Sequence, residues 1–138
     1  MNPFTIESQQ TVLVEGLTGP DGATQMYITS GFIQLMGGAQ NTTISYSGLV
    51  EPTLTAGQFR RAIVTAAPAT LAVWQMGMPP AGVTQKVSAR WSVSSADADW
   101  DDESGKIELQ FETQASGDPA LYTVVERLSF QALIFVGP

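Results

Sequence analysis

Residues 86–115 read KVSARWSVSSADADWDDESGKIELQFETQA, and they carry the clearest signal of the fold. In 86–94 every second residue is apolar, and in 106–115 a similar alternation recurs with Glu and Gln between Ile107, Leu109, Phe111 and Ala115. Period two is typical of a strand with one buried and one wet face. We therefore predict an antiparallel hairpin with the acidic segment DADWDDESG (97–105) at its tip. Arg90 should then lie near Glu108 or Glu112 on the outer face, as a cross-strand charge pair.

Similar patterns predict further strands around 11–14, 25–35, 41–50, 69–76 and 121–136. Gly31 should mark a bulge in one of them, and Glu126 a bend or bulge in the last. The segment 56–67 is predicted to be a short helix, because Thr55 and Gln58 have capping-box spacing, and a strand remains the alternative there. The fold class is mainly β: a single antiparallel β-sandwich domain over 1–138, jelly-roll or immunoglobulin-like, with about seven strands and one inserted helix near 56–67.

Composition excludes several classes of chemistry. The formal net charge is −7 with only six basic residues, which argues against binding nucleic acid through its phosphates. The chain contains neither Cys nor His, so Ser-His-Asp, Cys-His and zinc-hydrolase mechanisms have no residues to use. We therefore predict that the protein is not an enzyme. Charged residues make up 14 %, and Ser, Thr, Gln and Gly give a neutral polar surface.

No targeting or membrane segment is expected. The first ten residues have neither a basic nor an apolar region typical of a secretory signal. No apolar run approaches the ~20 residues of a membrane helix. We expect synthesis in the cytoplasm and assembly into a particle or at a surface, and localisation stays open.

The acidic segment admits three interpretations. Asp97, Asp99 and Asp101 occupy the first, third and fifth positions of a cation-loop spacing, and Glu108 the twelfth. Asp102 stands at the sixth position, where the EF-hand loop needs glycine, so this spacing does not indicate an EF-hand. A β-loop calcium site formed by Asp97, Asp99, Asp101 and Asp102 is the first interpretation. The others are an acidic docking surface for a basic partner and a solvated hairpin tip that discourages aggregation.

Two apolar features suggest contacts with other molecules. Trp100 lies in the middle of the acidic tip, so its indole either folds back onto the sheet or is displayed for contact. Near the C-terminus, Leu133, Ile134 and Phe135 belong to the apolar run ALIFV (132–136). If that strand were exposed it would invite pairing with another chain, and otherwise it is an inner strand of its own sandwich.

These observations favour a non-catalytic structural or assembly subunit that acts through protein–protein contacts. We expect a homo-oligomer, or a partner in an ordered particle such as a phage or a surface layer, without a cofactor. The alternative is a small calcium-dependent, lectin-like module. In that module the 97–105 loop would hold sugar hydroxyls through calcium, and Trp100 would stack on the sugar.

Overall fold

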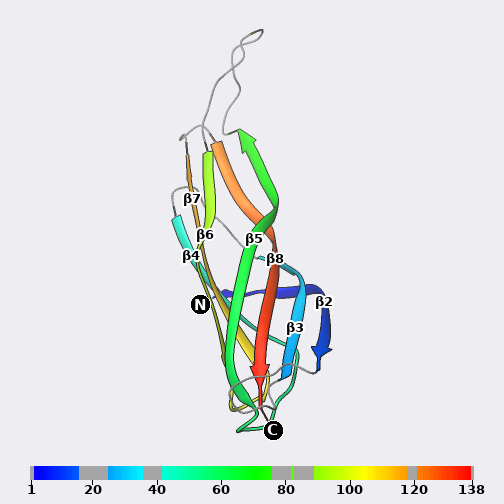
Figure 1. Ribbon diagram of the computed structural model, residues 1–138. Helices are drawn as coiled ribbons and strands as arrows, with labels where there is room; N and C mark the ends of the chain where they lie inside the picture. Colours follow the sequence, from blue (N-terminus) through cyan, green and yellow to red (C-terminus); the bar gives the residue numbers. More distant parts are fainter. Residues whose placement is uncertain are drawn as a thin grey trace.

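The strands pair into two four-stranded sheets that pack face to face (Figure 1). The computed structural model describes residues 2–15, 25–35, 42–75, 82, 89–117 and 121–137. Its strands are β1 (Asn2–Pro3), β2 (Thr5–Val14), β3 (Gln25–Gln34), β4 (Thr42–Val50), β5 (Phe59–Gln75), β6 (Ala89–Trp100), β7 (Ile107–Gly117) and β8 (Leu121–Val136). Sheet A has the order β1-β4-β7-β6 and sheet B the order β2-β3-β8-β5. All pairs are antiparallel except β1–β4.

The predicted β-sandwich is confirmed, and the described residues form eight strands where about seven were expected. Two hairpins, β2–β3 and β6–β7, contribute neighbouring strands to sheets B and A respectively. Neither strand order is the A-B-E-D or C-F-G order of immunoglobulin domains. Across the described residues there is no helix, and so none that could span a membrane.

The core lies between the sheets and follows the period-two pattern. On β7 the side chains of Ile107, Leu109 and Phe111 are at most 2 % exposed. The inner faces of both sheets, together with three residues outside the strands (Phe4, Leu35 and Leu54), supply the buried apolar core; its strand members are Ile33, Tyr46, Val50, Ile107, Leu109, Phe111, Leu128, Phe130, Ala132, Ile134 and Val136. Burial of one large apolar side chain contributes about 1.5–3 kcal/mol, so this cluster supplies the main favourable free energy of folding.

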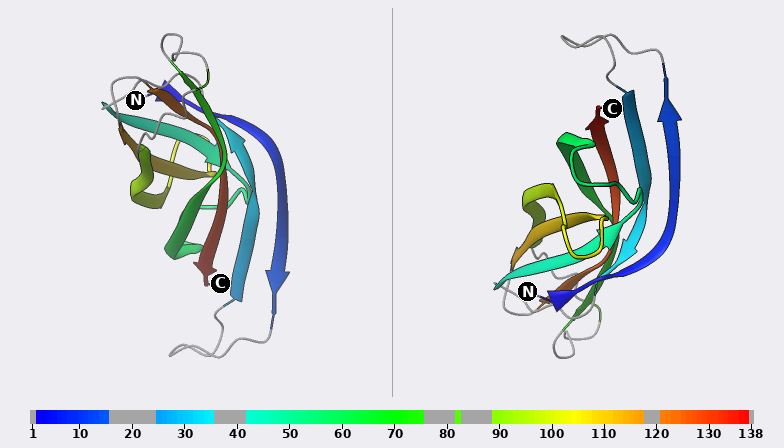
Figure 2. Two further views of the ribbon diagram at one scale, coloured as in Figure 1. Left: turned by 90° about the horizontal axis from the view of Figure 1, so that it is seen from above. Right: turned by 90° about the horizontal axis from the view of Figure 1, so that it is seen from below.

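The N-terminal strand passes from one sheet to the other at Phe4. The short β1 pairs with β4 in sheet A, and β2 then forms one edge of sheet B (Figure 2). The Phe4 ring lies on Gly48, where an added Cβ would be 2.5 Å from the ring atoms, and 6.0 Å from the ring centre of Phe111. Glycine at position 48 therefore leaves the space that this crossing needs.

The predicted helix near 56–67 is wrong. Residues 56–58 form a turn, and Phe59 begins the long strand β5. Half of the capping box is nevertheless present, because the Gln58 side chain accepts a hydrogen bond from the Thr55 backbone N–H at 2.7 Å. Gly57 has a φ of 95°, a left-handed conformation that ends a helix, and β8 offers an adjacent strand for pairing. Tertiary pairing thus overrides the local helix signal.

The predicted bulge at Glu126 is confirmed and the one at Gly31 is wrong. Opposite β5, Thr70 pairs with Arg127 and Leu71 with Val125, so Glu126 is the extra residue. Gly31, by contrast, pairs regularly, and the register shift lies on the neighbouring strand between residues 6 and 8. This bulge brings the backbone of β2 so close that a Cβ on residue 31 would be 2.0 Å from a carbonyl oxygen.

Candidate functional site

The predicted β6–β7 hairpin is confirmed, and its strands reach further toward the tip than expected. Trp100 pairs with Ile107 and Asp99 with Glu108, so only residues 101–106 form the turn. The predicted position of Arg90 is wrong. Arg90 lies opposite Ser116, because the short turn moves all of β6 along β7. Four residues, about 13 Å along the strand, separate residue 116 from residue 112.

Asp101 closes the turn. Its carboxylate accepts hydrogen bonds from the Ser104 hydroxyl at 2.6 Å and from the Ser104 backbone N–H at 3.0 Å. These two donors, the hydroxyl first, hold the pKa of Asp101 below its ordinary value. The Asp101 carbonyl accepts from the Gly105 N–H at 2.8 Å, and Gly105 has a φ of 72° that favours glycine. The turn is therefore stabilised by its own side chains and backbone.

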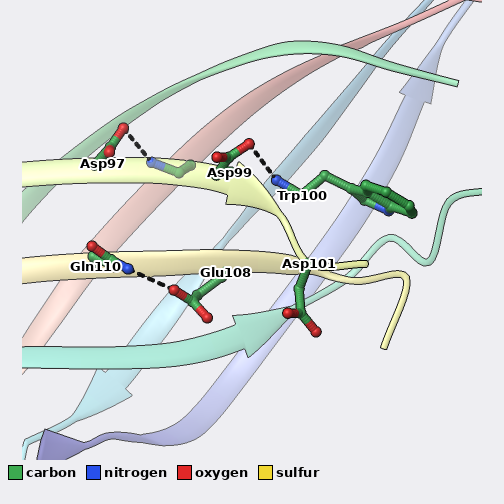
Figure 3. Close-up of a pocket in the computed structure, with 7 residues that line it drawn as sticks. Asp97, Asp99, Trp100, Asp101, Glu108 and Gln110 are labelled. Carbon is green, nitrogen blue, oxygen red and sulfur yellow. Dashed lines mark hydrogen bonds between the residues drawn. The ribbon is translucent and has the colours of Figure 1, made fainter. Parts of the chain in front are cut away.

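The Trp100 indole folds back toward the sandwich. Its ring packs against the core beside Ala98, and its Nε1–H donates to the Gly105 carbonyl at 3.1 Å. The same carbonyl accepts from the Leu54 backbone N–H at 2.7 Å, which ties the tip to the segment before β5. In Figure 3 the indole points away from the neighbouring aspartates. A role in holding the hairpin to the body accounts for these contacts.

Asp97 and Asp99 cover the free edge of sheet A. One carboxylate oxygen of Asp97 accepts from the Ala98 N–H at 2.9 Å, and one of Asp99 accepts from the Trp100 N–H at 2.8 Å (Figure 3). Asp101 donates its N–H to the Lys106 carbonyl, so the odd-numbered residues of β6 near the tip make the ladder hydrogen bonds. The N–H groups of residues 98 and 100 consequently face the open edge of β6. The two aspartates satisfy donors that another strand would otherwise use.

The four predicted calcium ligands do not share one point. A depression is lined by Asp97, Asp99, Trp100 and Asp101 together with Glu108, while Asp102 is an exposed turn residue outside it. All four carboxylates of the depression already accept hydrogen bonds within the hairpin, from backbone N–H groups, from a serine or, for Glu108, from the Gln110 amide at 2.6 Å. Among the residues described, no three acidic side chains gather as a metal site would require.

The C-terminal run ALIFV forms the inside of sheet B. Strand β8 pairs with β3 on one side and β5 on the other, so the exposed-strand alternative is wrong and the inner-strand alternative is confirmed. Ile134 is fully buried in the core. Leu133 and Phe135 point to the opposite, outer face of the sheet and are half-buried.

Strand register assembles an apolar surface around Leu133 and Phe135, which we call the apolar band. Residues that pair across the four strands of sheet B lie side by side. Near the C-terminal end of β8, most of the residues whose side chains face outward are apolar. The first row consists of Val12, Ile28, Leu133 and Ile63, and the second of Val14, Met26 and Phe135. At its two ends Val12 is 46 % exposed and Ile63 is 44 % exposed.

Polar residues limit the apolar band. The second row ends at Arg61, whose guanidinium lies 4.9 Å from the centre of the Phe135 ring. On the other side of the first row lies a polar row, formed by Gln10, Ser30, Gln131 and Thr65. The sequence analysis named Leu133 and Phe135 as contacts but missed the band, because its first row takes one residue from each of four strands and depends on their register.

Comparison of this chain with known protein families, with curated proteins and with solved structures finds no significant match.

Proposed function

We propose that this protein is a non-catalytic structural subunit that assembles through protein–protein contacts. The observation that carries the proposal is the apolar band on the outer face of sheet B. A sandwich that stays alone in water keeps the outer faces of its sheets polar, and a contiguous exposed apolar patch usually marks an interaction site.

The other sheet provides an internal comparison. The outward residues of β7 are Glu108, Gln110, Glu112 and Gln114, and their partners on β4 are Leu49, Ser47, Ser45 and Thr43. Leu49, at 38 % exposed, is the one apolar residue among these eight, whereas the first row of the apolar band consists of apolar residues on all four strands. Each Å² of apolar surface that a partner covers contributes about 25 cal/mol, from which the cost of association is subtracted.

The alternative, a calcium-dependent lectin-like module, receives less support. The carboxylates of Asp97, Asp99 and Asp101 satisfy donors of their own hairpin. The Trp100 indole, which would stack on a sugar, packs against the core instead. These contacts use one oxygen of each carboxylate and the indole N–H within the hairpin itself.

The proposal is tested by measuring mass in solution with light scattering at several protein concentrations, in calcium and in chelator. We expect an oligomer whose mass increases with protein concentration and is the same in calcium and in chelator. Ile63→Lys should lower its mass, because a charge then interrupts the band. Thr65→Lys is the matched control, since it places the same charge on the same face of β5, one row outside the band.

A monomer at every concentration would contradict self-assembly, and so would an Ile63→Lys protein with the mass of the wild type. A mass that changes only with calcium would favour the lectin-like alternative.

A further inference from the structure

The four edges of the two sheets differ in how they are protected. In sheet A, β1 is only two residues long, and β6 is covered by Asp97 and Asp99 and bears a register shift. In sheet B, β5 contains Pro68 with register shifts beside it. Prolines, bulges, charges and short strands are the devices that keep sheet edges from pairing with other chains. From Ser8 to Val14, the described part of β2 has none of them.

The unprotected stretch of β2 reads SQQTVLV (8–14) and contains neither a charge nor a proline, in a chain of net charge −7. It lies at the edge of sheet B (Figure 2), and its residues are exposed except for the half-buried Val14. The preceding Glu7 lies at the bulge and forms an ion pair with Arg127 at 2.7 Å. Repulsion between two copies is therefore smallest along this edge.

We propose that β2 pairs antiparallel with β2 of a second copy of this chain, with Val12 opposite Val12 of the second copy. The inference rests on the proposed function and assigns its first contact. Opposite residues of paired strands share a face, so outward Val12 must meet an outward residue of the partner strand. With Val12 at the two-fold axis, Gln10 lies opposite Val14, Thr11 opposite Leu13 and Gln9 opposite Glu15.

This register is favoured over the one centred on Thr11 by its charges, and over the one centred on Leu13 by the continuity of the first row. It opposes no like charges, whereas a shift that centres the axis on Thr11 would place Glu7 opposite Glu15 and Val12 opposite Gln10. It also joins the first row of the apolar band to that of the second copy, so that the row crosses eight strands. Such a contact is isologous, as in most homodimers, and adds main-chain hydrogen bonds between the copies. The joined band stays open on one face for further subunits.

The test is a charge exchange at residue 12. Val12→Lys and Val12→Glu each place like charges opposite each other, so each protein alone should dimerise about tenfold more weakly. An equal mixture should recover the wild-type affinity, because Lys then faces Glu. The measurement is mass by light scattering over a dilution series, with circular dichroism to confirm that each variant is folded. Ile63→Lys and Ile63→Glu, at the far end of the same row, are the matched controls and should not rescue each other.

A disulfide provides a second measurement. The chain has no cysteine, so in Val12→Cys only two copies can be joined. Opposite Cβ atoms in an antiparallel pair are about 4.5–5.5 Å apart, close to disulfide geometry, so oxidation should give a covalent dimer. Ile63→Cys should form no covalent dimer under the same oxidation.

The outcomes separate the two proposals. If Ile63→Lys dissociates the oligomer while Val12→Lys assembles like the wild type and Val12→Cys forms no covalent dimer, assembly stands and the β2 contact is overturned. If the wild-type protein is monomeric at every concentration, both fail. Recovery in the mixture together with a covalent Val12→Cys dimer supports the β2 contact.

Discussion

Replacement of Gly31 by alanine tests the packing of the edge strand β2 on sheet B. A Cβ at this position would lie 2.0 Å from the carbonyl oxygen of Ser8 and 2.8 Å from the Cα of Gln9. Contacts below 3.0 Å essentially never occur for real Cβ atoms, so the two strands would have to separate by about 1 Å. Both obstructing atoms belong to the backbone, which cannot rotate away as a side chain could.

Overpacking of this kind costs about 1–3 kcal/mol of unfolding free energy. For a domain of this size each kcal/mol lowers the melting temperature by about 2–4 °C, so Gly31→Ala should melt about 2–12 °C lower than the wild type. The assay is thermal unfolding followed by circular dichroism. Ser30→Ala, on the outer face of the same strand, is the control and should stay within about 0.5 kcal/mol of the wild type. Unchanged melting of Gly31→Ala would show that the β2 backbone does not lie over residue 31, and the register of the edge would be wrong.

Three further predictions concern the acidic hairpin and the core. The double variant Asp97→Ala/Asp99→Ala exposes two edge N–H groups on β6, so it should remain folded but self-associate more strongly in light scattering; equal association would contradict the edge-covering role. Addition of calcium should shift the melting temperature by less than about 1 °C, because a ligand stabilises only a native protein that binds it, and a larger shift would favour the calcium hypothesis. Burial raises the pKa of Tyr46, an effect larger than the opposing hydrogen bond with Thr113. The neutral phenol is therefore the form that the fold favours, and stability should fall as the pH rises above the ordinary tyrosine value of about 10. Tyr46→Phe should lose less stability over that range in alkaline denaturation curves, and parallel losses would refute the assignment.

Local sequence predicted the parts of the structure that depend on neighbouring residues. The alternation in 106–115 identified β7 and its buried face, and the hairpin with β6 followed from two such runs around a turn-forming segment. The bulge at Glu126 was also visible, because a charge interrupts an apolar alternation. The segment after Thr55 was misread, since one turn of capping geometry is present and only the pairing of β5 with β8 makes the chain continue as a strand.

The candidate site depended on relations that sequence does not contain. The spacing of the aspartates in the acidic segment left a cation site, a docking surface and a solvated tip as alternatives, because it says nothing about which backbone donors face an open sheet edge. Once β6 is placed at the edge of sheet A, Asp97 and Asp99 have donors to cover. Leu133 and Phe135 were correctly singled out as apolar, yet the surface to which they belong requires β2, β3 and β5 in register beside them.

The sequence alone was therefore sufficient to predict a mainly β sandwich, because period-two alternation is a property of neighbouring residues. Composition alone excluded mechanisms that use histidine or cysteine. Long-range pairing was needed to establish which strands lie at the edges, which apolar residues share an outer face, and that β2 is left unprotected. Those properties arise between segments distant in the chain, where register, and not residue type, selects the neighbours.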